Sequence, residues 1–93
     1  MLSKIPIDLN RIKRGALDAE ILRAAIIAEL DAINLYEQMA GITQNRNIKK
    51  LLLDVAKEEK THVGEFQAFL LSEDKEQEKE LKKGKKEVDE LIK

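Results

Sequence analysis

Two glutamates and one histidine are the residues of this chain whose types and spacing could do chemistry together. Glu59 and His62 lie three positions apart in a stretch without Gly or Pro. Positions i and i+3 of a helix share one face, so the carboxylate and the imidazole can reach the same point. Glu29 lies thirty residues earlier, in a second segment of helical periodicity. Carboxylate oxygens and an imidazole nitrogen suit iron or manganese and are acceptable to zinc, so the trio predicts a metal site.

The pattern of apolar residues places Glu59 and His62 on the buried face of their helix. At about 100° per residue, both fall inside an apolar arc of roughly a third of the circumference. The arc is formed by Ile48, Leu52, Val55, Phe66, Phe69 and Leu70. Glu58 and Glu65 fall at its edge, where solvated carboxylates belong, so we assign the pair to Glu59. A structural His–Glu hydrogen bond remains the simpler alternative for this pair alone.

Glu29 lies in the middle of an apolar stripe on a helix predicted over 19–40. Asp18 is the predicted N-cap and Gly41 the predicted C-terminal end. The stripe consists of Leu22, Ile26, Ile33, Tyr36 and Ala40. A buried carboxylate there costs several kcal/mol unless it is paired, and the facing stripe offers no Lys or Arg. Metal binding explains Glu29 better than a structural role does.

A short polar loop over 42–46 predicts that two antiparallel helices bring the three residues together. Asn45 or Asn47 would cap the second helix, which we expect to end near Leu71. Gln44, at the centre of the loop, is fifteen residues from Glu29 and fifteen from Glu59. At 1.5 Å per residue both glutamates lie roughly 22 Å from the turn and face each other. The predicted fold is all-α, an antiparallel two-helix hairpin with a short C-terminal helix.

We expect two parts along the chain. Residues 1–72 form the hairpin with an N-terminal arm over 1–17, and residues 73–93 form a highly charged C-terminal helix or tether. Gly84 is expected to interrupt or kink that helix. Its thin apolar edge consists of Leu81, Val88, Leu91 and Ile92.

Composition restricts the function and suggests assembly. The chain has 93 residues and no Cys, so disulfides, thiolate zinc sites and cysteine nucleophiles are excluded. With 17 basic and 18 acidic residues, we expect no nucleic-acid or membrane partner, and the first residues lack a signal-peptide pattern. A cytoplasmic protein is predicted. A chain this short buries little apolar surface, so oligomerisation or metal binding is expected to stabilise it.

One hairpin carries only half of the ligands that a di-iron carboxylate bundle uses. Such bundles take four Glu and two His from four helices, whereas one chain offers two Glu and one His. A second copy related by a twofold axis would supply the other half. The expected state is therefore a dimer that forms a four-helix bundle around two metal ions.

These residues resemble the ferritin-like superfamily and, within it, encapsulated ferritin, whose chains are half-ferritin helical hairpins. Glu29, Glu59 and His62 match the pattern of that family, and Tyr36, seven residues after Glu29, matches a tyrosine that can hydrogen-bond a metal ligand. The resemblance implies a ferroxidase that oxidises Fe²⁺ with O₂ at a di-iron site between subunits. It also implies a ring of dimers, expected to be a decamer, that supplies iron for storage inside an encapsulin nanocompartment. Asp31 is the carboxylate left near Glu29 that could guide iron to the site.

Two other functions fit the same residues. A rubrerythrin-like peroxidase or a di-manganese protein would use the same ligands, although the lack of Cys removes a rubredoxin-type electron donor from this chain. A non-catalytic assembly or cargo module would use them to bind a structural metal such as zinc.

Overall fold

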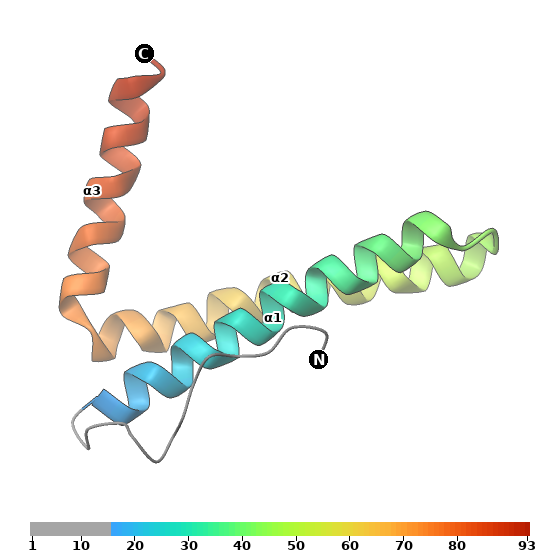
Figure 1. Ribbon diagram of the computed structural model, residues 1–93, viewed down its shortest axis with the longest axis horizontal. Helices are drawn as coiled ribbons and strands as arrows, with labels where there is room; N and C mark the ends of the chain where they lie inside the picture. The colour runs from blue at the N-terminus through green and yellow to red at the C-terminus, as the bar shows by residue number, and fades with distance from the viewer. Residues whose placement is uncertain (1–15) are drawn as a thin grey trace.

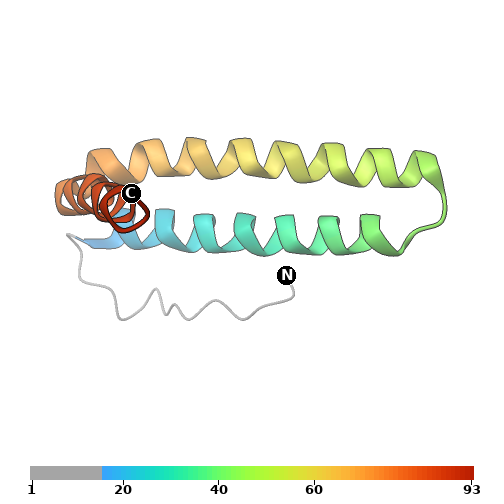
Figure 2. The same ribbon diagram turned by 90° about the horizontal axis from the view of Figure 1, so that it is seen from above.

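The computed structural model describes residues 16–93, which form three helices and no strand. The helices are α1 (Leu17–Ile42), α2 (Arg46–Glu73) and α3 (Lys75–Leu91). α1 and α2 lie side by side and antiparallel, while α3 turns away from their common axis (Figure 1). The view from above shows the hairpin at full length and α3 nearly end-on (Figure 2). The predicted all-α hairpin with a C-terminal helix is confirmed. The predicted N-terminal arm lies almost entirely outside the described residues.

Both predicted ends of the first helix are wrong. Ala16 is the N-cap and gives no side-chain hydrogen bond, whereas Asp18 lies inside the first turn, where its charge complements the helix dipole. The helix continues through Gly41 to Ile42. Gly41 does not adopt the positive φ that a helix-ending glycine cap requires, and neither does any other glycine among the described residues. The chain instead leaves the helix at Thr43, whose ψ of 140° is extended.

Asn45 sets the start of α2 and fixes the hairpin turn. Its side-chain Oδ1 accepts hydrogen bonds from the backbone N–H groups of Asn47 at 3.0 Å and Ile48 at 3.1 Å. These donors lack partners within the helix, so the cap satisfies two of the groups that would otherwise be unpaired. Asn45 rather than Asn47 is therefore the cap.

The core of the single chain, as far as the structure describes it, is small. Its buried hydrophobic residues are Ile33 and Ala40 of α1 with Ala56 and Leu70 of α2. Two of the four are alanines, which let the helices approach closely and bury little area. By contrast, twelve large hydrophobic side chains of the described region are exposed. A salt bridge of 3.0 Å from Lys60 to Glu37 also joins the helices, but exposed pairs of this kind contribute little.

Asp74 forms the junction between α2 and α3. α2 runs two residues beyond the predicted end, to Glu73. The Asp74 side chain then caps α3 by accepting from the Gln77 N–H at 3.0 Å, and Arg23 of α1 donates to its Oδ2 at 2.6 Å. The Gln77 N–H and the Arg23 guanidinium hold the pKa of Asp74 below its usual value.

The predicted break at Gly84 is wrong. α3 is continuous over its 17 residues, because a single Gly costs only about 1 kcal/mol relative to Ala and the flanking Lys and Glu residues favour a helix. From Lys79 onward every residue of α3 is exposed. Among the described residues, no helix combines the length and apolar character needed to cross a membrane.

Candidate metal centre

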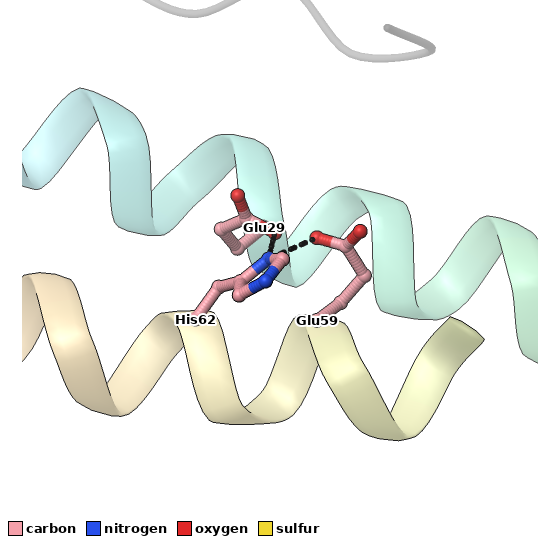
Figure 3. Close-up of side chains that lie close together, drawn as sticks. All are labelled: Glu29, Glu59 and His62. Carbon is pink, nitrogen blue, oxygen red and sulfur yellow. Dashed lines mark hydrogen bonds and ion pairs between the residues drawn. The ribbon is translucent and has the colours of Figure 1, made fainter. Parts of the chain in front are cut away.

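Glu29, Glu59 and His62 converge at the middle of the hairpin, as the register predicts. Each offers one potential ligand atom, and these atoms all lie within 4.8 Å of one another. Figure 3 shows Glu29 projecting from α1 and the other two side chains projecting from α2 toward it. Within residues 16–93 this is the one group of His and acidic side chains with such spacing. The antiparallel register thus brings together residues that are thirty or more positions apart in the sequence.

The hydrogen bonding within the cluster is incomplete. His62 Nδ1 lies 3.4 Å from Glu59 Oε2, a long hydrogen bond, and 3.5 Å from Glu29 Oε2. One ring nitrogen carries at most one hydrogen, so it cannot satisfy both carboxylates. Glu29 Oε2 is consequently buried without a hydrogen-bond partner, unlike any other side-chain oxygen or nitrogen in the described part of the chain.

A buried carboxylate oxygen without a hydrogen-bond partner is what a metal ligand looks like when no metal is bound. Leaving such an atom unsatisfied costs about 1–3 kcal/mol, and more when it is charged. A cation held by Glu29, Glu59 and His62 would offset that cost for all three groups. The donors are oxygens and an imidazole nitrogen, a set that suits iron and manganese and that zinc accepts. The residues present therefore fit the metal that their spacing predicts.

The cluster opens toward one uncovered face of the hairpin. The side chains of Glu29 and Glu59 are only 19% and 18% exposed, whereas that of His62 is 42% exposed. Leu51 and Phe69 lie eleven residues before and seven after His62, which places them on the same face of α2. They are 61% and 69% exposed. A half-covered imidazole therefore lies within an apolar stripe that the described residues leave unburied.

Two further predicted residues lie apart from the cluster. Tyr36 is half-buried on α1, two turns beyond Glu29 and on the same side of the helix. No hydrogen bond links Tyr36 to Glu29, Glu59 or His62. The predicted role of Tyr36, to hydrogen-bond a metal ligand, therefore stays a prediction. Asp31 is half-buried but is rotated by about 200° from Glu29, and it is not part of the cluster. A role in guiding iron likewise stays a prediction.

Comparison with known proteins identifies the family of this chain. The model of the Rubrerythrin family matches residues 20–93, a range that contains all three clustered residues. The chain belongs to this family. A solved structure, described as the encapsulated ferritin domain from Pyrococcus furiosus, superposes with a TM-score of 0.83 at 59% identity. That match covers 98% of this chain and 95% of the other, so the resemblance to encapsulated ferritin is confirmed.

A curated relative shows a larger context. The ferritin-like–encapsulin shell fusion protein of Pyrococcus furiosus is 60% identical over 93 residues. The match covers 98% of this chain but only 27% of that protein. The chain thus spans about a quarter of the length of this relative.

Proposed function

We propose that the chain is a ferroxidase that oxidises Fe²⁺ to Fe³⁺ with O₂ at a site made by Glu29, Glu59 and His62. The observation that carries the proposal is the buried Glu29 Oε2, which has no hydrogen-bond partner and lies beside two further potential ligands. A structural His–Glu hydrogen bond accounts for Glu59 and His62. Such a bond does not account for the buried Glu29 carboxylate, whereas a bound cation does.

The complete site requires two copies of the chain. One hairpin supplies two carboxylates and one imidazole, half of the set that di-iron carboxylate bundles use. The half-exposed His62 and the exposed Leu51 and Phe69 share a face that a second hairpin would cover. A twofold axis beside this face would form a four-helix bundle and bring in the second set of ligands. Such dimers would assemble further into a ring, for which a decamer is our expectation.

Two iron ions held close together allow a paired electron transfer. Each Fe²⁺ loses one electron, so two ions reduce O₂ by two electrons, and with two protons the product is H₂O₂. The carboxylates of Glu29 and Glu59 would balance the charge that grows as the iron is oxidised, while His62 would hold its position. Iron is the substrate here, and manganese or zinc would compete for the same donors.

The fused relative suggests where the oxidised iron goes. In that protein a ferritin-like part and an encapsulin shell belong to one polypeptide. We infer that this chain works inside an encapsulin nanocompartment in the cytoplasm, either joined to the shell protein or bound to it. An open ring of hairpins encloses no space of its own, so the shell would store the mineral.

Titration of the metal-free protein with Fe²⁺ tests the proposal. Ferric absorbance and O₂ uptake are followed against iron added per chain, for the parent protein, for Glu59→Gln and for Glu58→Gln. We expect rapid oxidation with a break at about one iron per chain, as two chains share two ions. Glu58→Gln should match the parent, because Glu58 is exposed, whereas Glu59→Gln should abolish the fast phase.

Other outcomes would favour the alternatives. Tight binding without O₂ uptake would indicate a structural metal in an assembly module. Oxidation of bound Fe²⁺ by H₂O₂ much faster than by O₂ would favour a rubrerythrin-like peroxidase, which the family match makes the second candidate.

A further inference from the structure

A single residue, Asp74, separates α2 from α3. α2 ends at Glu73 and α3 begins at Lys75. Asp74 has φ −131° and ψ 89°, outside the helical region. Its backbone still belongs to both helices, since its N–H donates to the Leu70 carbonyl at 2.8 Å and its carbonyl accepts from the Glu78 N–H at 3.2 Å. These are pairs four residues apart, as in a helix, so the two hydrogen-bond ladders meet at one residue.

The backbone near the junction does not require this bend. Residues 70–78 contain neither Gly nor Pro, which are common causes of a sharp kink. Most of them are Leu, Lys, Glu or Gln, which favour a helix. One continuous helix over residues 46–91 would regain up to three backbone hydrogen bonds, from the N–H groups of residues 75–77 to the carbonyls of residues 71–73. The bend therefore depends on contacts that side chains make.

The Asp74 carboxylate makes two such contacts, one with each oxygen. Oδ1 accepts from the Gln77 N–H at 3.0 Å and replaces one of the helical hydrogen bonds that the bend breaks. Oδ2 accepts from Arg23 Nη2 of α1 at 2.6 Å, an ion pair between residues 51 positions apart. The Asp74 side chain is only 21% exposed, so water screens this pair less than a pair on an open surface. Arg23 thus ties the junction to the hairpin.

Apolar packing does little to hold α3 at its angle. α3 contains no buried residue, and within residues 16–93 it packs only against α2, near their junction (Figures 1 and 2). The structure extends 47 Å along its longest axis, whereas one continuous helix over residues 46–91 would measure roughly 69 Å. The direction of α3 therefore depends mainly on the contacts of Asp74 with Arg23 and Gln77.

We propose that Asp74 is a hinge and that its ion pair with Arg23 selects the bent one of two conformations. In the other conformation α2 and α3 join into one helix over residues 46–91, and α3 extends past the end of the hairpin opposite its turn. Only the bent conformation has the Asp74 contacts, so their loss shifts the population toward the continuous helix. His62 lies twelve residues before the hinge, roughly 18 Å along α2. The hinge can therefore redirect α3 without moving the metal centre.

The distance between two spin labels on one chain tests the hinge, since the chain has no Cys of its own. Lys50→Cys and Lys86→Cys place one label on α2 and one on α3, both at exposed positions. In one continuous helix these positions share a face and lie roughly 54 Å apart. In the bent chain two arms of roughly 36 and 18 Å meet at an angle at Asp74, and the distance is shorter. Pulsed electron paramagnetic resonance measures this distance, with chelator present and with an excess of unlabelled chains to exclude distances between subunits.

Three substitutions in the labelled chain separate the ion pair from the cap. Arg23→Met removes the guanidinium but leaves the cap, and it should raise the ratio of the long to the short distance about fivefold or more. Asp74→Ala removes both contacts and should make the long distance predominant. Lys60→Met is the matched control, because it breaks an ion pair between α1 and α2 away from the junction, with Glu37. This control should leave the distances unchanged.

Three results would contradict the proposal. An Asp74→Ala chain that keeps the short distance would overturn the hinge. A broad range of distances in that variant would indicate a flexible joint and overturn the continuous helix. A shift in Asp74→Ala without any shift in Arg23→Met would overturn the role of the ion pair. Circular dichroism of the same samples separates straightening from unfolding, because unfolding lowers the helix content and straightening does not.

Discussion

Replacing Glu29 by glutamine should make the metal-free protein more stable while removing its response to metal. Glutamine has the shape of glutamate but no charge. In the structure the Oε2 atom of Glu29 is buried, has no hydrogen-bond partner and lies 3.5 Å from His62 Nδ1. A buried, unsatisfied polar group costs about 1–3 kcal/mol, and a charged one costs more. Removing the charge should therefore stabilise the metal-free fold by about 1 kcal/mol.

The stabilisation by bound metal that Glu29→Gln loses should be larger than the stability that the metal-free protein gains. Metal that binds only the folded protein stabilises it by about 2.7 kcal/mol when its concentration is a hundred times the dissociation constant. Changing a group behind a metal ligand already weakens affinity by about 10–100-fold, so losing a ligand should weaken it at least as much. A hundredfold loss at the same metal concentration would leave about 0.4 kcal/mol. For a domain of this size, the metal-induced rise in Tm would fall from about 10–20 °C to about 2–3 °C.

Thermal unfolding by circular dichroism measures both effects. Parent, Glu29→Gln and Glu58→Gln proteins are compared at one protein concentration, with chelator or with anaerobic Fe²⁺, because oligomers unfold at a Tm that depends on concentration. Glu58→Gln is the matched control, an exposed carboxylate outside the cluster. A variant whose Tm rises with Fe²⁺ as much as that of the parent would refute Glu29 as a ligand. A lower Tm without metal would refute the argument from burial.

Three further changes test the hairpin and its junction with α3. Asn45→Ala should lower the free energy of unfolding by about 1 kcal/mol, because two backbone N–H groups lose their acceptor; urea titration measures it. Leu70→Ala, at a residue only 6% exposed, should cost about 2–5 kcal/mol in the same assay. Asp74→Asn tests a pH dependence whose sign follows from the lowered pKa of Asp74. A depressed folded-state pKa contributes stability that is present above the unfolded value of 3.8 and is lost as pH falls through the folded value. The stability difference between the parent and Asp74→Asn should therefore be constant above about pH 5 and shrink toward zero below the unfolded value. A difference that stays unchanged down to the acid transition would contradict the role of the Gln77 and Arg23 contacts.

The cluster was predictable because helix geometry converts sequence spacing into distance. Glu29 and Glu59 lie at equal distances from the turn, and an antiparallel hairpin must then bring them to the same height. His62 follows Glu59 by one turn and shares its face. These relations depend on the hydrophobic period and on a short loop, both of which the sequence states clearly. The structure places the three potential ligand atoms within 4.8 Å of one another.

The ends of the helices were less predictable because capping depends on backbone angles that residue types only favour. Gly41 and Gly84 look like helix breakers, yet neither adopts a positive φ and both lie inside helices. Asp18 looks like an N-cap, but α1 begins before it, and its carboxylate suits the first turn as well as the cap position. The sequence left Asn45 and Asn47 open as the cap of α2, and the structure selects Asn45, whose Oδ1 accepts from the backbone N–H groups of Asn47 and Ile48.

The limited core of the single chain connects the metal centre to assembly. The four buried hydrophobic residues of the described region, two of them alanines, cannot offset the ordering of a hairpin this long. Residues 16–93 leave further apolar surface open, and Leu51 and Phe69, on the face of α2 that carries His62, are 61% and 69% exposed. A second hairpin on that face would bring its own carboxylates close to Glu29 and Glu59. Apolar burial would then favour the dimer while charge repulsion opposed it, and a bound cation would decide the balance. Metal should therefore promote assembly, and Glu29→Gln, which lowers the repulsion, should dimerise with less dependence on metal than the parent protein.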